Sequence, residues 1–594
     1  MNKKISHGTI LLLAIVSVAF HLWLVFSSLY PNLVTRPLHL ALALPWVFII
    51  GKKSRFQAIS GTLLTFIGVA ICFWIAYSHE DLLDQYGSLE TEAQYFWGVG
   101  LILIVLEMAR RQVKLALPLV AAICIAYGLF GDLLPSQFSH AGIPLDTFLG
   151  TLVITEGGLW GSLTGISVSV ISVFIILGAF VSAGEGGNAF MNLAVKLAGK
   201  YRAGSAKVSI LSSAFFGSIS GSASANVAST GAITLPAMKR LGYPPSFAAA
   251  VEAVASTGGQ IMPPLMGAGA FLMVELLRVS YVEIMEAAIL PALLFFFCTW
   301  VGVDHFAKRY NLKGIAKDQL PTWYLVFRLS SFFFLPFATL LVILFCTTYT
   351  AQVGATAAIA VTAVMLIANR NGLDSFENIL EKYQQAIINS AKQISTVASI
   401  IICAGLIIGV LNLTGLGVKI TSMILSFSGG NLWIALLLTA LACLILGMEV
   451  PTTAAYAICI SVAGPALETL GLPPLYSHLF VFWYALLSTI TPPVCGTVFI
   501  ASSMANAPWL QVAMRAMRLG LGLYIVPLAM VANPSLIKLT TEPFFALIAA
   551  IKIGVGLWLI SYALTGNNPS KWRPLAALLI GGLVIFMLPV GSLS

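Results

Sequence analysis

Stretches of apolar residues long enough to cross a lipid bilayer recur along the whole chain, from Ile10 to Leu588. A helix that spans the hydrocarbon core needs about 17–25 consecutive, mostly apolar residues. Because backbone N–H and C=O groups find no partners in hydrocarbon, such long runs are predicted to be helices. Of the 594 residues, 59% are hydrophobic and 9% are charged, whereas soluble domains average about 25% charged residues. The sequence therefore predicts an all-α polytopic membrane protein without a sizeable soluble domain.

The basic residues predict how the chain is oriented. Short cytoplasmic loops of membrane proteins are enriched in Lys and Arg. When the N-terminal MNKK is placed in the cytoplasm and each apolar run crosses once, the clusters at 52–55 and 110–114 also become cytoplasmic, while the acidic segment 79–94 does not. The formal charge of +9 is thus interpreted as a set of topology signals and not as a nucleic-acid-binding surface. The first apolar run lacks a convincing cleavage site, so we expect it to be retained as a helix.

Composition divides the chain into three parts. After the loop at 131–148, Gly and Ser become frequent and the apolar runs are interrupted. We expect a helical membrane module over 1–135, a large transport part over 136–536, and extra transmembrane helices over 537–594. The eight cysteines and seven histidines are dispersed. Since metal sites need clustered ligands, we interpret the cysteines as packing residues.

Two interruptions in the apolar pattern carry most of the functional signal. Residues 217–226 read GSISGSASAN, and irregular backbone at membrane depth is tolerated only where it is buried in protein or lines a cavity. The segment 205–240 is too short for two spans, so we predict a re-entrant hairpin with its tip at 217–226. The sequence ASTGGQIMPP at 255–264 predicts an unwound centre in the following helix.

The second half of the chain repeats the pattern of the first. The double prolines at 244–245 and 263–264 recur at 473–474 and 492–493, all 229 positions later. We therefore predict a structural repeat over approximately 160–300 and 395–515. Its second copy would hold a hairpin with its tip near GMEVPTTAAY and a helix broken at STITPPVCG. The predicted topology makes the two copies inverted, an arrangement typical of secondary transporters with a binding site between paired broken helices.

Residues 212–275, from SSAFFGSISG to GAFLMVE, closely resemble the fused membrane permease subunit of tripartite ATP-independent periplasmic (TRAP) transporters of the TAXI class. The resemblance implies that a small subunit, here 1–135, is joined to the large transport subunit in a bacterial inner membrane. It also implies an elevator-type mechanism and symport with an ion. The expected partner is a separate periplasmic binding protein of TAXI type, which delivers a small organic anion, usually a carboxylate or dicarboxylate.

The hairpin tips and the facing breaks supply the candidate binding residues. Half-helix N-termini suit a carboxylate, whereas hydroxyls and unwound carbonyls suit Na⁺. Outside these stretches, small residues are interpreted as helix-packing residues. No Lys or Arg lies in either break. The substrate- and ion-binding candidates are Ser220, Gly221, Ser222, Ser224 and Asn226; Ser256, Thr257, Gly258, Gly259 and Gln260; Glu449, Pro451, Thr452 and Thr453; and Ser488, Thr489 and Thr491.

Two carboxylates are predicted to lie at bilayer depth, where an ionisable group is costly and points to function. Glu449 belongs to the second tip and could ligate Na⁺ or carry a proton. Glu252 precedes the first break and is interpreted either as a second coupling group or as a structural anchor. Na⁺ is the expected coupling ion because of the hydroxyl-rich breaks and the resemblance, and H⁺ stays open.

The sequence thus predicts a secondary active importer of small organic anions. The chain contains no GxxxxGK[ST] motif, so an ion gradient is the expected energy source. It also lacks HExxH and Gly-x-Ser-x-Gly motifs, and an enzyme is not expected. The alternative is a binding-protein-independent, ion-coupled carboxylate transporter of related architecture.

Overall fold

The computed structural model describes residues 6–27, 30–50, 54–113, 115–135, 137–264, 266–369, 372–448, 450–493, 495–566, 572–587 and 589–591. Over these residues the protein is built of helices, apart from the short hairpin of β1 (Ala368–Asn369) and β2 (Gly372–Leu373). Ten of the described helices are long and apolar enough to cross a membrane. The prediction of an all-α polytopic membrane protein is confirmed.

The chain forms two compact units, which are described separately. The first comprises Met1–Gly184, Phe334–Met423 and Ser461–Ala463; the second comprises Glu185–Phe333, Ile424–Ile460 and Gly464–Ser594. The domain boundaries expected at residues 135 and 536 stay predictions.

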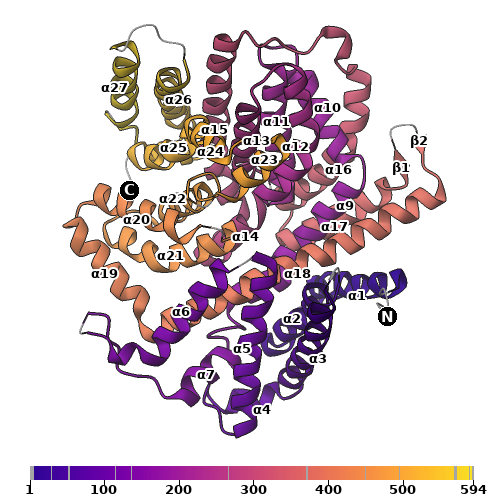
Figure 1. The fold of residues 1–594 in the computed structure, drawn as a ribbon, viewed down its shortest axis with the longest axis vertical. Coiled ribbons are helices and arrows are strands. Elements are labelled where there is room, and N and C mark those ends of the chain that lie inside the picture. Colours follow the sequence, from indigo (N-terminus) through magenta and orange to yellow (C-terminus); the bar gives the residue numbers. More distant parts are fainter. Residues whose placement is uncertain are drawn as a thin grey trace. The chain divides into compact units, whose positions relative to one another are not determined.

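The first unit is assembled around one long helix, α18 (Phe376–Thr414), which contacts α1, α2, α5, α6 and α9 (Figure 1). The C-terminal part of α18, from Ala398 to Leu411, is almost entirely buried, as expected for a helix surrounded by others. The remaining helices of this unit are α1 (His7–Phe26), α2 (Asn32–Phe48), α3 (Arg55–Tyr77), α4 (His79–Asp84), α5 (Glu92–Val113), α6 (Ala116–Phe130), η1 (Gly131–Leu133), α7 (Leu145–Val153), α8 (Ser162–Ile166), the π-helical η2 (Ser167–Ile171), α9 (Ser172–Ala183) and α17 (Ala351–Met365).

Two histidines that are dispersed in the sequence meet inside this unit. His21 Nδ1 bonds the Ser17 carbonyl at 2.7 Å, His21 Nε2 lies 2.8 Å from His39 Nδ1, and His39 Nε2 lies 3.0 Å from Ser167 Oγ. Since the Ser17 carbonyl only accepts, the neutral chain runs from the Ser167 hydroxyl through both rings to that carbonyl. This buried polar chain joins α1, α2 and η2.

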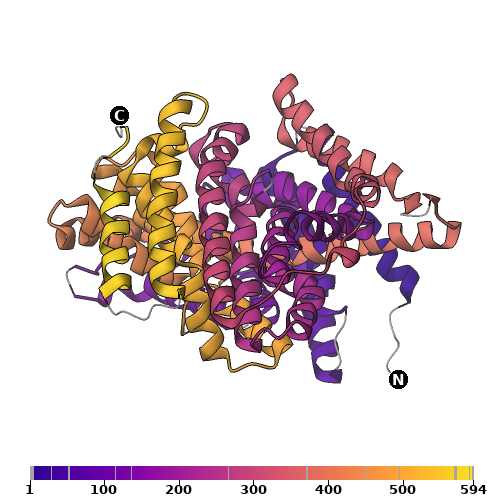
Figure 2. The ribbon, with the colours of Figure 1, turned by 90° about the horizontal axis from the view of Figure 1, so that it is seen from above.

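The second unit contains most of the two segments that are predicted to form re-entrant hairpins, and their re-entry into a membrane stays a prediction. Its helices are α10 (Gly186–Ala198), α11 (Gly204–Ser220), α12 (Ala223–Arg240), α13 (Pro245–Gly258), η3 (Gly259–Ile261), α14 (Gly267–Leu277), α15 (Tyr281–Tyr310), η4 (Lys317–Gln319), α20 (Leu432–Leu446), α22 (Pro474–Leu487), α23 (Gly496–Ala505), α24 (Trp509–Leu519), α25 (Leu521–Ala532), η5 (Pro534–Ile537), α26 (Pro543–Thr565) and α27 (Trp572–Phe586). Three helices have residues in both units, namely α16 (Trp323–Cys346), α19 (Leu416–Ser428) and α21 (Thr452–Thr469). Helices α11, α12 and α13 pack on one another, and α26 lies beside α15 and α27 (Figure 2).

Helix boundaries recur at the spacing found in the sequence. Helix α12 begins and ends 229 positions before α21, and α13 begins and ends 229 positions before α22. The Pro263–Pro264 and Pro492–Pro493 bonds are both cis. Two sets of helices of equal order and length therefore follow one another, and their opposite orientation across a membrane stays a prediction.

The first tip is much shorter than predicted. Helix α11 extends to Ser220 and α12 begins at Ala223, which leaves Gly221 and Ser222 between them. Gly221 closes α11 with a φ of +60°, a conformation that suits glycine. Ser222 caps α12, because its Oγ accepts the Ala225 N–H at 3.3 Å. A serine-rich tract can remain helical when its hydroxyls bond the preceding turn, as Ser218 Oγ does with the Phe215 carbonyl at 2.8 Å.

The first break also starts later than predicted. Ser256, Thr257 and Gly258 still belong to α13, and Thr257 Oγ1 bonds the Ala253 carbonyl at 2.9 Å. A single turn of η3 follows, so that the interruption lies at 262–266. Its cause is the proline pair, which lacks backbone N–H donors. In the second repeat, residues 488–495 separate α22 from α23 as predicted.

Candidate functional site

The Gln260 side chain is where the first tip, the first break and the second hairpin meet. Its Nε2 donates to the Gly221 carbonyl at 2.6 Å, and its Oε1 accepts from Thr452 Oγ1 at 3.1 Å. Gly221 belongs to the first tip, and Thr452 is the first residue of α21. Three stretches that the sequence singled out separately therefore share one amide in the second unit.

Threonines connect α13 to the second break beside this point. Thr257 Oγ1 lies 3.1 Å from Thr489 Oγ1 and 3.5 Å from Thr497 Oγ1. Thr497 Oγ1 also donates to the Thr489 carbonyl at 2.7 Å. The result is a group of three hydroxyl oxygens, one each from α13, the second break and α23. Thr497 was not among the candidates, because its position after the proline pair had no distinctive pattern.

Glycines allow the backbones around the site to approach closely. A Cβ on Gly217 would lie 2.5 Å from Gly259 Cα, and one on Gly267 would lie 2.7 Å from Gly221 Cα. A Cβ on Gly258 would instead lie 1.8 Å from the Phe295 ring. Gly217, Gly221 and Gly259 thus bring the hairpin and the break together, while Gly258 provides packing space for α15.

Asn226 fastens the first hairpin to α13. It is fully buried, and its Nδ2 donates to the Ser213 carbonyl at 2.8 Å and to the Ser256 carbonyl at 3.4 Å. These acceptors lie on α11 and α13. In this arrangement the amide nitrogen of Asn226 links three helices.

Glu252 is a fully buried carboxylate in the same three-helix bundle. Both of its oxygens accept hydrogen bonds from hydroxyls on all three helices, namely Ser209 and Ser213 of α11, Thr230 and Thr234 of α12, and Ser256 of α13. Among the described residues no basic side chain forms an ion pair with Glu252. A buried carboxylate without a partner is costly, so the hydroxyls take the place of a counter-ion.

This hydroxyl cage can satisfy either protonation state of Glu252. Thr230 Oγ1 lies 2.8 Å from the Asn226 carbonyl, and Thr234 Oγ1 lies 3.0 Å from the Thr230 carbonyl. Each hydroxyl has one proton, which goes to the carboxylate when Glu252 is ionised and to the backbone when Glu252 is neutral. In the neutral state one of the freed hydroxyls can accept the carboxyl proton. The sequence does contain a signal for this cage, as Ser/Thr pairs four residues apart at 209/213 and 230/234, but these pairs lie outside the predicted tip at 217–226.

The remaining predicted site residues lie at several places in the second unit. Thr491 Oγ1 bonds the Leu487 carbonyl and the Tyr524 hydroxyl, each at 2.7 Å, and Ser488 Oγ bonds the Ala485 carbonyl at 2.7 Å. Ser220 ends α11, Ser224 is exposed, and Thr453 lies in the first turn of α21. Glu449 lies outside the described residues.

The two hairpins differ in how their second helices begin. Ser222 caps α12 with its side chain, whereas the N-cap residue of α21 is Pro451, which makes no side-chain capping bond. The first N–H groups of a helix lack intrahelical partners and attract anions. The start of α21 is therefore the better place for a carboxylate, next to the Thr452 hydroxyl.

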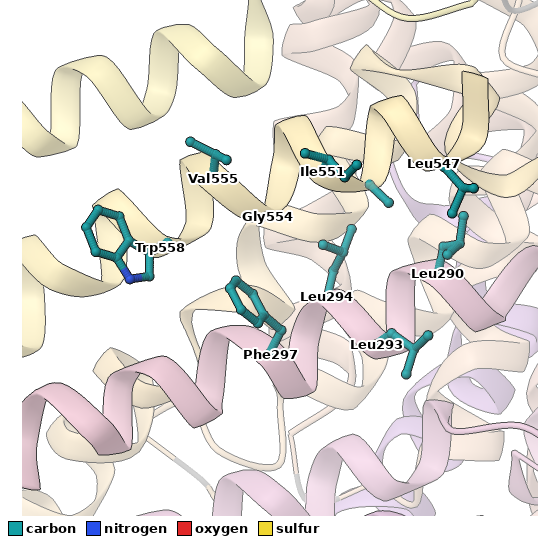
Figure 3. A pocket seen from close by; sticks show the side chains of 10 residues that line it. Leu290, Leu293, Leu294, Phe297, Leu547, Ile551, Gly554, Val555 and Trp558 are labelled. Atoms are coloured by element: carbon teal, nitrogen blue, oxygen red, sulfur yellow. The ribbon is translucent and has the colours of Figure 1, made fainter. Parts of the chain in front are cut away.

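An apolar pocket lies elsewhere in the second unit. It has a volume of about 500 Å³ and lies between α15 and α26, where Leu294 and Phe297 face Ile551 and Trp558 (Figure 3). Its walls are apolar side chains of two membrane-spanning helices. It offers almost no polar groups for an organic anion and is not the transport site.

Comparisons with known proteins identify the family of the chain. A family model described as "Tripartite ATP-independent periplasmic transporter, DctM component" matches residues 101–545. The isethionate TRAP transporter permease protein DctMQ of Oleidesulfovibrio alaskensis is 25% identical over 399 residues, which cover 66% of this chain and 60% of that protein. The C4-dicarboxylate TRAP transporter large permease protein DctM of Pseudomonas aeruginosa is 25% identical over 339 residues, 57% of this chain and 77% of the relative. The 2,3-diketo-L-gulonate TRAP transporter large permease protein YiaN of Escherichia coli is 25% identical over 352 residues, 57% and 78% respectively.

Proposed function

Because the chain belongs to the DctM family of TRAP transporter large permeases, which carry organic acids and work with a periplasmic binding protein, we propose that it is a fused, TAXI-class permease. The proposed activity is ion-driven import of small carboxylates or dicarboxylates across the bacterial inner membrane. The family match begins at residue 101. The preceding described residues include two candidate spans, which supports a joined small subunit.

The convergence of tips and breaks in the second unit carries the proposal. An uncapped α21 start supplies N–H groups for a carboxylate, beside the Thr452 hydroxyl. The hydroxyls of Thr257, Thr489 and Thr497 form an oxygen-only donor set, which suits Na⁺. We place the coupling Na⁺ at these hydroxyls, with Glu449 as a further candidate ligand. Two equally ordered sets of helices support an inverted repeat and an elevator-type movement of the hairpins.

Proton coupling is the second possibility for the energy source. The Glu252 cage favours it, because the surrounding hydroxyls can bond both the ionised and the neutral carboxyl group. In the proton-coupled mechanism, Glu252 carries the proton, and the hydroxyls of Thr257, Thr489 and Thr497 bind the substrate without Na⁺.

The test is uptake of radiolabelled dicarboxylates into proteoliposomes, with and without the cognate binding protein, under an imposed Na⁺ or proton gradient. Uptake that needs the binding protein supports the TRAP assignment, and the effective gradient identifies the ion. Thr257→Val and Thr489→Val should each lower uptake at least tenfold, while Thr469→Val at the far end of α21 should not. Uptake that is equally fast without the binding protein would favour the binding-protein-independent transporter.

A further inference from the structure

The two hairpins are joined through both ends of one side-chain amide. Gln260 is 5% exposed and Thr452 is 8% exposed, so water does not readily replace their hydrogen bonds. The Gly221 carbonyl only accepts, which places the amide nitrogen of Gln260 against it. The amide oxygen then accepts the Thr452 proton, and turning the amide around would break the contact with Gly221.

The repeat has no second copy of the Gln260–Thr452 bond. The position 229 residues after Gln260 is Thr489, and the position 229 residues before Thr452 is Ala223. A threonine has no long amide, and an alanine has no hydroxyl, so the equivalent bond cannot form between the second break and the first hairpin. Thr489 contacts Thr257 instead.

We infer that Gln260 is a positioning residue that latches the first hairpin to the second, and that its bond with Thr452 breaks when the site opens for an organic anion. The bond to Thr452, at 3.1 Å, is longer than the bond to Gly221, at 2.6 Å, so Thr452 is the partner that separates. A carboxylate oxygen is a hydrogen-bond acceptor like the amide oxygen. An incoming carboxylate can therefore take the place of Gln260 at the Thr452 hydroxyl. This role rests on the proposed transport function.

The latch can be tested without any substrate, by measuring how fast a buried cysteine near the tip is labelled. Ala223 at the start of α12 is 4% exposed, and Ala223→Cys in a chain without the eight native cysteines provides the reporter. A membrane-impermeant methanethiosulfonate reagent is applied to the purified permease. Because one hydrogen bond holds the latch, Gln260→Ala and Thr452→Val should raise the labelling rate about two- to tenfold. Thr452→Ser keeps the hydroxyl and should be labelled at the same rate as the reporter chain with Thr452.

Two comparisons distinguish a latch from general loosening. Combining Gln260→Ala with Thr452→Val should raise the rate no further than Gln260→Ala alone, because Gln260→Ala already removes the bond to Thr452. A second reporter, Ala355→Cys in α17, is fully buried far along the chain and should be labelled at an unchanged rate. Unchanged labelling at residue 223, additive effects of the two variants, or equal acceleration at both reporters would each overturn the latch. Since no substrate or binding protein is present, failure of the uptake assay would count against the transport proposal and not against this result.

Discussion

Replacing Glu252 tests whether its carboxyl group organises the first hairpin. In Glu252→Ala, five hydroxyls lose their acceptor. Thr230 and Thr234 retain backbone carbonyls at 2.8 and 3.0 Å. Ser213 Oγ also stays 3.1 Å from Thr230 Oγ1 and 3.5 Å from Ser256 Oγ, so Ser209 bears most of the loss. One unsatisfied buried hydroxyl costs about 1 kcal/mol at the lower end of the usual range. The cavity left by the side chain adds about 2 kcal/mol, for an expected loss of about 3 kcal/mol.

Glu252→Gln should cost far less, about 1 kcal/mol, because the amide keeps the shape and one acceptor oxygen. Its nitrogen would donate to hydroxyls that can turn their protons toward the backbone, as Thr234 can. The assay is the free energy of unfolding of the purified permease in mixed micelles, measured by titration with a denaturing detergent. Glu275 on α14 is exposed, and Glu275→Ala is the matched control, with an expected change below about 0.5 kcal/mol.

Two results would refute the reasoning. If the free energy of unfolding of Glu252→Ala lies within about 1 kcal/mol of the wild-type value, the hydroxyls do not depend on the carboxyl group. If Glu252→Gln is as harmful as Glu252→Ala, the cage requires a negative charge, and the two protonation states are not interchangeable.

Three further variants have defined outcomes. Gly217→Ala should destabilise the permease by about 1–3 kcal/mol or more, measured by the same titration, because its Cβ would lie 2.5 Å from Gly259 Cα. Asn226→Ala removes the amide that links three helices and should abolish uptake while the protein still inserts; wild-type uptake would exclude this role. Outside the spans, the hydrogen bond from Lys382 lowers the pKa of Asp374 to about 2 from 3.8. This contribution to stability is present above pH 3.8 and is lost as the pH falls through 2, so the difference between the wild type and Asp374→Asn should disappear over that range.

Sequence reasoning succeeded where one local property decides the structure. Apolar length determines the spans, and the proline pairs at 263–264 and 492–493 determine where helices are interrupted, since proline cannot donate a backbone hydrogen bond. The 229-residue spacing of these prolines predicted the recurrence of α12 and α13 as α21 and α22.

The extent of the irregular segments could not be predicted in the same way. The serines of 217–226 looked incompatible with a helix in an apolar setting, yet Ser218 bonds its own preceding turn. Whether a hydroxyl bonds locally or faces a partner depends on the packing of neighbouring helices. The bond between Gln260 and Thr452 joins positions 192 residues apart, and no local pattern identifies such a pair.

The contrast between Glu252 and Gln260 indicates how the first hairpin can move. Within the bundle of α11, α12 and α13, the Glu252 cage and the Asn226 amide connect all three helices through buried bonds. Toward the second hairpin, the bonds of the described side chains include those of Gln260 with Thr452 and of Thr257 with the second break. A network shared among three helices resists separation more than contacts that can be exchanged for a ligand. The three helices are therefore expected to move as one body, with separation occurring at the Gln260 side, where a carboxylate would enter.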